Sequence, residues 1–392
     1  MAESFDVVIA GGAAMGSSVA YHLAADPAFR GRVLVVEKDP SYRFCASALS
    51  ASSIRQQFST RINVAISLYG ISFLRRADDL LAVEGQRPSL APREDGYLFL
   101  ATSEGRSVLA ENHALQTEIG ADILWHEPAD LGARFPWLAT EGVSAGCWGR
   151  SGEGWFDGYG LMMAFRAKAR ALGVAYRAGE VVDVVRAGNR VAAVVLADGS
   201  RIGCGAVVNC AGTGGRALAA RAGIELPVHA KKRMVFTFKC RDELLGFPLL
   251  IDPSGVWVRP ESDGYICGTA PPPDNDPDAV DFEVDHGFFD EAVWPVLAAR
   301  VPAFEAIRPG RAWAGHYDMC LFDHNAFVGG AGEPANFYLA NGFSGHGLQQ
   351  SPAVGRGLAE LIVHGRYVSL DLSPLGYERL RLGRPLIERN VV

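Results

Sequence analysis

The sequence predicts a two-domain α/β protein in which one domain is built around a parallel βαβ unit. The first observation is length, because 392 residues exceed the ~100–200 residues of an ordinary domain. The second is the order of residues 5–37, which indicates a strand, a glycine turn, a helix and a strand. The third is a series of short β-branched runs between residues 181 and 330, which is typical of a mixed or antiparallel sheet.

The βαβ unit is predicted element by element. Residues 5–10 are apolar and rich in β-branched side chains, which favours a buried parallel strand. The turn 11–16 follows at once, and residues 17–25 carry apolar side chains at helical spacing. A second buried strand, residues 32–37, ends in Glu37.

The turn itself predicts a dinucleotide site. A G-x-G-x-x-G turn needs small residues for tight turning, for close approach of a pyrophosphate and for helix–strand packing. Here the pattern is Gly11-x-Ala13-x-x-Gly16, with a methyl group at the middle position. Glu37 lies close to the ~20-residue spacing expected of an acid that binds a ribose 2′-OH. Such an acid disfavours NADP but leaves NAD and FAD open.

The rest of the chain alternates helices and strands. Residues 55–81 predict a helix with an apolar stripe, and residues 158–172 and 348–364 predict two more. Strands are predicted at residues 96–100, 174–176, 181–185, 191–196, 205–212, 234–238, 255–259, 264–268, 312–318 and 326–330. The proline- and acid-rich residues 271–281 predict a surface loop.

Composition excludes several classes of function. The net charge of −7 gives no basic footprint for nucleic acid. The seven cysteines form no CxxC pair, and no spacing indicates a metal site. No run of 18 uncharged apolar residues occurs, and no targeting segment is evident at the N-terminus. We expect a cytoplasmic protein without a membrane span.

Three blocks of residues carry a family resemblance. They are Asp6 to Gly12 (DVVIAGG), Val207 to Gly212 (VVNCAG) and Ala340 to Gly347 (ANGFSGHG), in that order along the chain. Together they resemble the D-amino acid oxidase-like family of flavoproteins, which includes sarcosine oxidase, glycine oxidase and dimethylglycine dehydrogenase. Residues 46–58 and 311–318 look closest to the branch of FAD-dependent oxidoreductase domain-containing proteins.

The resemblance implies a Rossmann-type FAD-binding domain with an inserted α+β substrate domain on a mixed or antiparallel sheet, in a glutathione reductase-like architecture. The FAD-binding domain would comprise residues 1–80, 151–230 and 320–392, and the substrate-binding domain residues 81–150 and 231–319. The cofactor-binding residues implied are Gly11, Gly12, Ala13, Ala14, Met15, Gly16, Glu37, Lys38, Ser47, Ala48, Ser50, Ala51, Ser52, Val181, Ala211, Gly212, Gly342, Phe343, Gly345, His346, Gly347, Leu348 and Gln349. Among them, the loop 342–349 would present a helix N-terminus to the pyrimidine end of the flavin, where reduced flavin gathers negative charge.

Four residues are candidates for contact with the substrate. Arg55 and Arg259 could hold a carboxylate, because a guanidinium in a cleft binds a carboxylate bidentately. Each could equally be an ordinary surface charge. His316 and Tyr317 follow a strand that the resemblance places over the flavin.

The activity implied is oxidation of a small amino acid or a secondary or N-alkylated amine by hydride transfer to flavin N5, giving an imine that hydrolyses. FAD is expected to be non-covalent, because residue 50 is Ser where dimethylglycine dehydrogenases have a flavin-linking His. Residues 265–270 hold no Lys, unlike sarcosine oxidases, which favours a dehydrogenase that passes electrons to a redox protein or quinone over an oxidase that uses O2. The alternatives are a non-catalytic FAD-binding assembly or scaffold protein and an NAD-dependent dehydrogenase.

Overall fold

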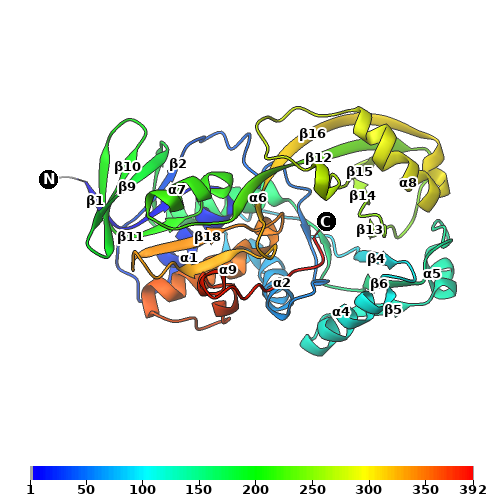
Figure 1. Cartoon of the computed structure of the whole chain (residues 1–392), viewed down its shortest axis with the longest axis horizontal. Helices are drawn as coiled ribbons and strands as arrows, with labels where there is room; N and C mark the ends of the chain where they lie inside the picture. The colour runs from blue at the N-terminus through cyan, green and yellow to red at the C-terminus, as the bar shows by residue number, and fades with distance from the viewer. Residues whose placement is uncertain (1–2, 392) are drawn as a thin grey trace.

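A computed structural model describes residues 3–391 and contains two large sheets (Figure 1). The first sheet has the order β17-β18-β11-β1-β2-β8, with the hairpin β9–β10 attached to β11. Strands β18, β11, β1, β2 and β8 run parallel, and β17 is antiparallel to β18. Its strands are β1 Ser4–Ala10, β2 Val33–Glu37, β8 Ala175–Ala178, β9 Val181–Ala187, β10 Arg190–Leu196, β11 Arg201–Asn209, β17 Phe327–Gly330 and β18 Phe337–Asn341.

The second sheet is mixed and has the order β16-β12-β15-β14-β13-β4-β6-β5. All neighbours in it are antiparallel except β13 and β4. Its strands are β4 Tyr97–Ala101, β5 Ile123–His126, β6 Ala145–Gly149, β12 Val228–Cys240, β13 Leu249–Ile251, β14 Trp257–Glu261, β15 Gly264–Gly268 and β16 Ile307–Cys320; β3 Ser53–Ile54 and β7 Gly154–Trp155 pair separately. The predicted fold class is confirmed. The domain boundaries stay a prediction.

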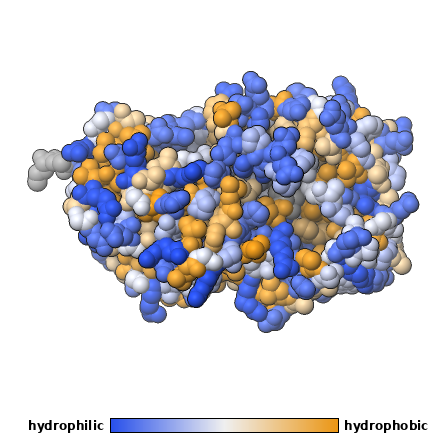
Figure 2. All heavy atoms as spheres, viewed as in Figure 1, coloured by the Kyte–Doolittle hydropathy of each residue, from blue (hydrophilic) through white to orange (hydrophobic). Residues whose placement is uncertain are grey.

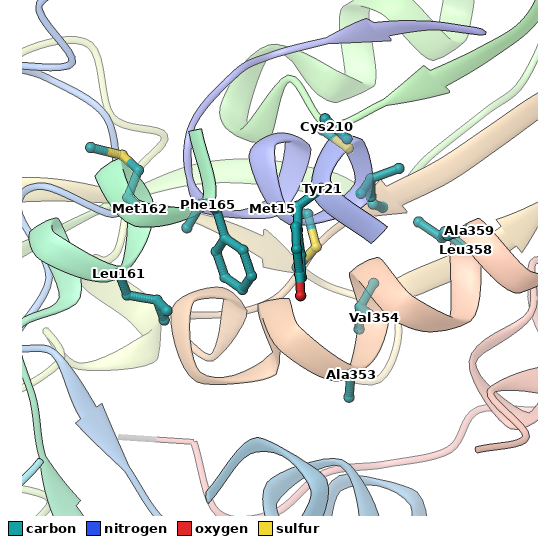
Figure 3. Close-up of a cluster of buried hydrophobic side chains, with 14 of the residues drawn as sticks. Met15, Tyr21, Leu161, Met162, Phe165, Cys210, Ala353, Val354, Leu358 and Ala359 are labelled. Atoms are coloured by element: carbon teal, nitrogen blue, oxygen red, sulfur yellow. The ribbon is translucent and has the colours of Figure 1, made fainter. Parts of the chain in front are cut away.

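Both faces of the first sheet are covered, because successive side chains of a strand point to opposite faces and the side chains on both faces are apolar. Val7 and Ile9 pack against α1 Ala14–Ala25, α6 Gly158–Ala171 and α9 Gly347–His364, whereas Val8 and Ala10 pack toward α7 Gly215–Arg221 and the β9–β10 hairpin. Figure 3 shows the first of these cores, where Phe165 of α6 lies beside Tyr21 of α1, with ring centroids 5.7 Å apart. The remaining helices are α2 Arg61–Leu74, α3 Ala77–Leu80, α4 Arg106–Ile119, α5 Pro128–Arg134, α8 Trp294–Arg300 and α10 Glu378–Arg381.

The helix predicted over residues 55–81 was wrong at its start. Helix α2 begins at Arg61, and residues 55–60 are not helical. The cause is tertiary: the backbone N–H of Arg55 donates to Gln349 Oε1 at 3.0 Å, and the N–H groups of Gln56 and Gln57 donate to the Glu153 carboxylate. These N–H groups are satisfied by distant side chains, so the segment has no need of a helix to satisfy them.

The surface shows no broad apolar area on the face in Figure 2, where hydrophilic and hydrophobic residues are interspersed. Of the helices among residues 3–391, none combines the length and apolar composition that crossing a bilayer requires.

Candidate active site

The glycine turn is held against a neighbouring strand. Gly11 has φ +97°, and a Cβ added there would lie 2.3 Å from the Cys210 carbonyl oxygen at the end of β11. A Cβ on Gly16 would lie 1.9 Å from the Gly11 carbonyl oxygen. Ala13, the middle residue of the pattern, is the N-cap of α1 and supplies no side-chain cap, so the first N–H groups of the helix are not capped by it.

Glu37 lies at the end of β2, beside this turn. Its Oε2 accepts a hydrogen bond from the Gly12 N–H at 2.7 Å, and its Oε1 accepts one from the Asp39 N–H at 2.9 Å. The carboxylate is therefore fixed at the carboxyl end of the parallel strands, where this type of sheet binds its ligands.

A cavity of about 630 Å³ opens between the glycine turn, the β9 end and the loop before α9. Fourteen of the predicted cofactor residues line it: Gly11, Ala13, Met15, Glu37, Lys38, Ser47, Ser50, Val181, Ala211, Gly212, Phe343, Gly345, Gly347 and Leu348. These residues come from three separate parts of the chain, within residues 11–50, 181–212 and 343–348. The uncapped helix start and the glycine cradle suit a pyrophosphate, so the residues present fit FAD.

Several predicted cofactor residues lie outside this cavity. The turn 11–16 and the loop after β2 contain four of them, Gly12, Ala14, Gly16 and Ala48. The Ala14 N–H donates to Ser47 Oγ at 3.4 Å, and Gly16 packs on Gly11. Gly342 packs on Val228 and Cys320 instead. Ala51, Ser52, His346 and Gln349 line a second, smaller cavity. Their contact with FAD stays a prediction.

The smaller cavity has a volume of about 70 Å³ and also touches Arg55. It lies under the inner face of the second sheet, which contributes Tyr97 from β4 and Trp257 from β14. Tyr317, Gly345 and Leu348 line both cavities, so the two spaces adjoin. One water molecule needs ~10–15 Å³ of cavity volume, so the smaller cavity has room for a small ligand.

Arg55 is 3% exposed, and its guanidinium contacts neutral groups. Nη2 donates to His346 Nε2 at 3.0 Å and to the Asn390 carbonyl oxygen. Nε is buried and has no hydrogen-bond partner among the described residues. Burial lowers the pKa of Arg55 and holds the pKa of His346 well below its usual range, so the imidazole is neutral and accepts from the guanidinium. The arginine is therefore a buried cation beside the smaller cavity, and its Nε donor is not satisfied by the described residues.

Arg259 does not line either cavity, contrary to the expectation that it faces the substrate. It is 4% exposed and forms an ion pair with Glu261, and its Nη2 donates to the Ala51 carbonyl oxygen at 2.6 Å. Its charge is thus paired within the protein, although Nε has no hydrogen-bond partner among the described residues. Its contacts tie β14 to the segment 46–52.

His316 and Tyr317 are adjacent in β16, and both line the large cavity. His316 Nε2 lies 2.6 Å from the Asp281 carbonyl oxygen, and its ring stacks on Phe282 at 4.0 Å. A carbonyl can only accept, so Nε2 carries the proton. The side chain of Tyr317 covers Gly345, where a Cβ would lie 2.3 Å from its ring, and burial raises the pKa of Tyr317.

The residues that line these cavities and that sequence reasoning missed include Phe44, Tyr97, Trp257, Phe282 and Asp318. Tyr97 and Trp257 occur in strands that the sequence predicts, but strand pattern alone does not tell which face meets a ligand. Phe44 is 51% exposed, and its ring centroid lies 5.0 Å from that of Phe282, which also lines the large cavity. No pattern in the sequence marked Phe44 or Phe282 as a cavity residue.

Asp318 gives the site a pH-dependent stability. Burial raises its pKa from 3.8 to about 6, although Oδ2 accepts from the Gly342 N–H at 2.8 Å. The folded state therefore favours the protonated carboxyl, and this contribution is complete below pH ~4 and lost as the pH rises to about 6. We expect the free energy of unfolding of Asp318→Asn, relative to the wild type, to increase between pH 4 and 6 and then stay level.

Urea denaturation of both proteins from pH 4.5 to 8 measures this difference. The exposed Asp242→Asn variant is the control and should follow the wild type at every pH. A difference between Asp318→Asn and the wild type that does not change with pH would contradict the expectation.

Comparison with known proteins agrees with this geometry. A family model described as FAD dependent oxidoreductase (DAO) matches residues 6–361. The chain belongs to this family. FAD is its cofactor, and the NAD alternative is excluded.

Three similar proteins extend over almost the whole chain. FAD-dependent oxidoreductase domain-containing protein 1 of Xenopus laevis is 42% identical over 100% of this chain and 85% of its own length. Glycine oxidase of Geobacillus kaustophilus is 25% identical over 97% of this chain and 98% of its own. The crystal structure of L-proline dehydrogenase from P. horikoshii superposes with a TM-score of 0.85 at 25% identity, covering 98% and 100% of the two chains.

Proposed function

We propose that the protein oxidises a small amino acid or N-alkylated amine, whose carboxylate is bound by Arg55. The observation that carries the proposal is the buried guanidinium at the smaller cavity, whose hydrogen-bond partners among residues 3–391 are neutral groups and not a carboxylate. A buried charge is costly unless it is paired, so a ligand carboxylate would complete this site. Two similar proteins, glycine oxidase and L-proline dehydrogenase, are named for small amino acids.

The chain's own residues would bind and orient the substrate. FAD, when bound, supplies the hydride acceptor. Arg55 would hold the carboxylate, and the rings of Tyr97, Trp257 and Tyr317 would exclude water around the donor carbon. Because the space is about 70 Å³, compact substrates are favoured over those with long side chains.

Anaerobic addition of an amine and amino acid panel tests the proposal. We expect the visible absorbance of the bound FAD to bleach with at least one small carboxylated amine and not with its matched amine that lacks the carboxylate. No bleaching with any compound would favour the alternative, a non-catalytic FAD-binding assembly protein.

The same preparation tests two finer points that we also propose. We expect acid precipitation to leave the flavin in the supernatant, as non-covalent FAD requires. A covalent link to FAD through a cysteine is not favoured either, because Cys320, the cysteine nearest in sequence to the final glycine loop, does not line the large cavity. We favour a dehydrogenase, because β15 and the two residues after it hold no Lys; faster turnover with an artificial dye acceptor than with O2 would agree. The cytoplasmic location of the protein stays a prediction.

A further inference from the structure

Residues 386–390, here called the C-terminal clamp, contact Arg55, which lines the smaller cavity. The C label in Figure 1 lies between the halves that hold the two large sheets. The clamp is fastened at its start, because the backbone N–H groups of Leu386 and Glu388 each donate to Asp323 at 3.0 Å. Asp323 is itself held by the buried Arg379 at 2.7 Å.

Glu388 anchors the middle of the clamp. It is 0% exposed, and its carboxylate accepts four hydrogen bonds from the start of α2: the N–H and Oγ of Ser59 at 2.8 and 2.6 Å, Thr60 Oγ1 at 2.8 Å and Asn63 Nδ2 at 3.0 Å. A carboxylate that loses such partners while buried is costly, so this anchor is specific. It also accepts from the Asn390 N–H at 3.1 Å, which sets the position of the next residues.

Asn390 joins the clamp to Arg55. Its carbonyl oxygen accepts from Arg55 Nη2, the same nitrogen that donates to His346. Its side chain donates to the Gln57 carbonyl oxygen at 3.0 Å and accepts from Asn112 Nδ2 at 3.2 Å. With Nη2 committed to two internal acceptors, the guanidinium is fixed in one orientation between the rings of Phe58 and Phe99, at 4.5 and 5.4 Å.

We propose that the C-terminal clamp is a positioning element for carboxylate binding, in which Glu388 holds the Asn390 carbonyl where it orients Arg55. Neither Glu388 nor Asn390 lines the smaller cavity, so both act through Arg55. The inference rests on the proposed function only in assigning the carboxylate to Arg55. A fixed guanidinium binds better than a mobile one because less side-chain entropy is lost on binding.

The test measures carboxylate binding to the holoprotein, using acetate as the probe and the absorbance change of bound FAD as the signal, with neutral acetamide as the comparison. We expect Glu388→Gln to raise the Kd for acetate about tenfold and to leave that for acetamide unchanged. FAD content should equal that of the wild type. Asn390→Gly, which keeps the anchor but frees the carbonyl, should act in the same direction. Glu378→Gln, in the exposed pair with Arg381, is the control.

A double-mutant cycle separates positioning from general loss of structure. In an Arg55→Met background, Glu388→Gln should have no further effect on acetate binding. An unchanged or lowered Kd for acetate in both Glu388→Gln and Asn390→Gly would overturn the proposal while leaving the proposed function intact. A wild type that binds neither acetate nor any other small carboxylate would instead overturn the Arg55 assignment, and the positioning role with it.

Discussion

Replacing Arg55 with methionine should lower kcat/KM for a carboxylated amine substrate by about 100-fold or more, with FAD still bound. Methionine keeps the apolar contact with the rings of Phe58 and Phe99, so the loss is that of the charge. Removing one partner of a buried, hydrogen-bonded charge pair costs ~2–5 kcal/mol, which corresponds to factors of ~30 to several thousand. Arg55→Lys should be intermediate, because it keeps the charge but loses the planar fork.

Steady-state kinetics on a substrate found by flavin bleaching provide the measurement. The exposed Arg241→Met is the matched control and should equal the wild type. The prediction requires the loss to be selective: an amine without a carboxylate should be oxidised by Arg55→Met as slowly as by the wild type. Equal losses for both kinds of substrate would show that Arg55 supports the fold and not the carboxylate.

Replacing Gly11 with alanine should abolish stable FAD binding. The φ of +97° is one that L side chains rarely adopt, and the new Cβ would lie 2.3 Å from the Cys210 carbonyl oxygen, where backbone cannot yield. Either β11 or the turn must move, and both border the cofactor cavity. We expect less than about a tenth of the wild-type flavin content, since a backbone shift at this turn removes the pyrophosphate contacts that dominate such sites.

The ratio of flavin to protein absorbance after purification measures this effect. Gly132→Ala is the control: it lies in α5, a Cβ added there would have no atom within 4 Å, and alanine favours a helix. Ala13→Gly should also keep FAD, because it restores the usual middle residue of the turn. A Gly11→Ala protein with full flavin content would show that the turn adapts to a side chain and that its close contact with β11 is not required.

The sequence was sufficient for the βαβ unit of the parallel sheet, because that unit depends on local patterns, and the family resemblance supplied fourteen of the residues that line the large cavity. Residues 5–37 contain the strand, turn, helix and acid in one short stretch, and β1, α1 and β2 form there. The surroundings of Arg55 could not be predicted in this way. Its partners Gln349 and Asn390 lie 294 and 335 positions away in the sequence. Contacts between such distant residues produce no periodic pattern of residue types from which they could be predicted.

The two candidate arginines show why the sequence alone could not select the residue that binds a carboxylate. Arg55 and Arg259 are alike as sequence features, and only the fold distinguishes them. Nε lacks a hydrogen-bond partner among the described residues in both side chains. Glu261, two residues further along β14, pairs with the charge of Arg259, whereas none of the ion pairs among the described residues includes Arg55. A carboxylate-binding arginine is therefore recognised by what its neighbours fail to supply, which is a property of packing.

The strand order of the first sheet also has a consequence for synthesis on the ribosome. Strand β11 pairs with β18, whose residues follow about 130 positions later, and α9 comes later still. While the chain is being made, one edge of β11 stays open and the cofactor cavity lacks a wall. The growing chain thus depends on delayed, long-range pairing, which slows folding and exposes an edge to aggregation. FAD is expected to bind only after β18 and α9 have been synthesised and have folded, and a chaperone that shields β11 until then should raise the yield of folded protein.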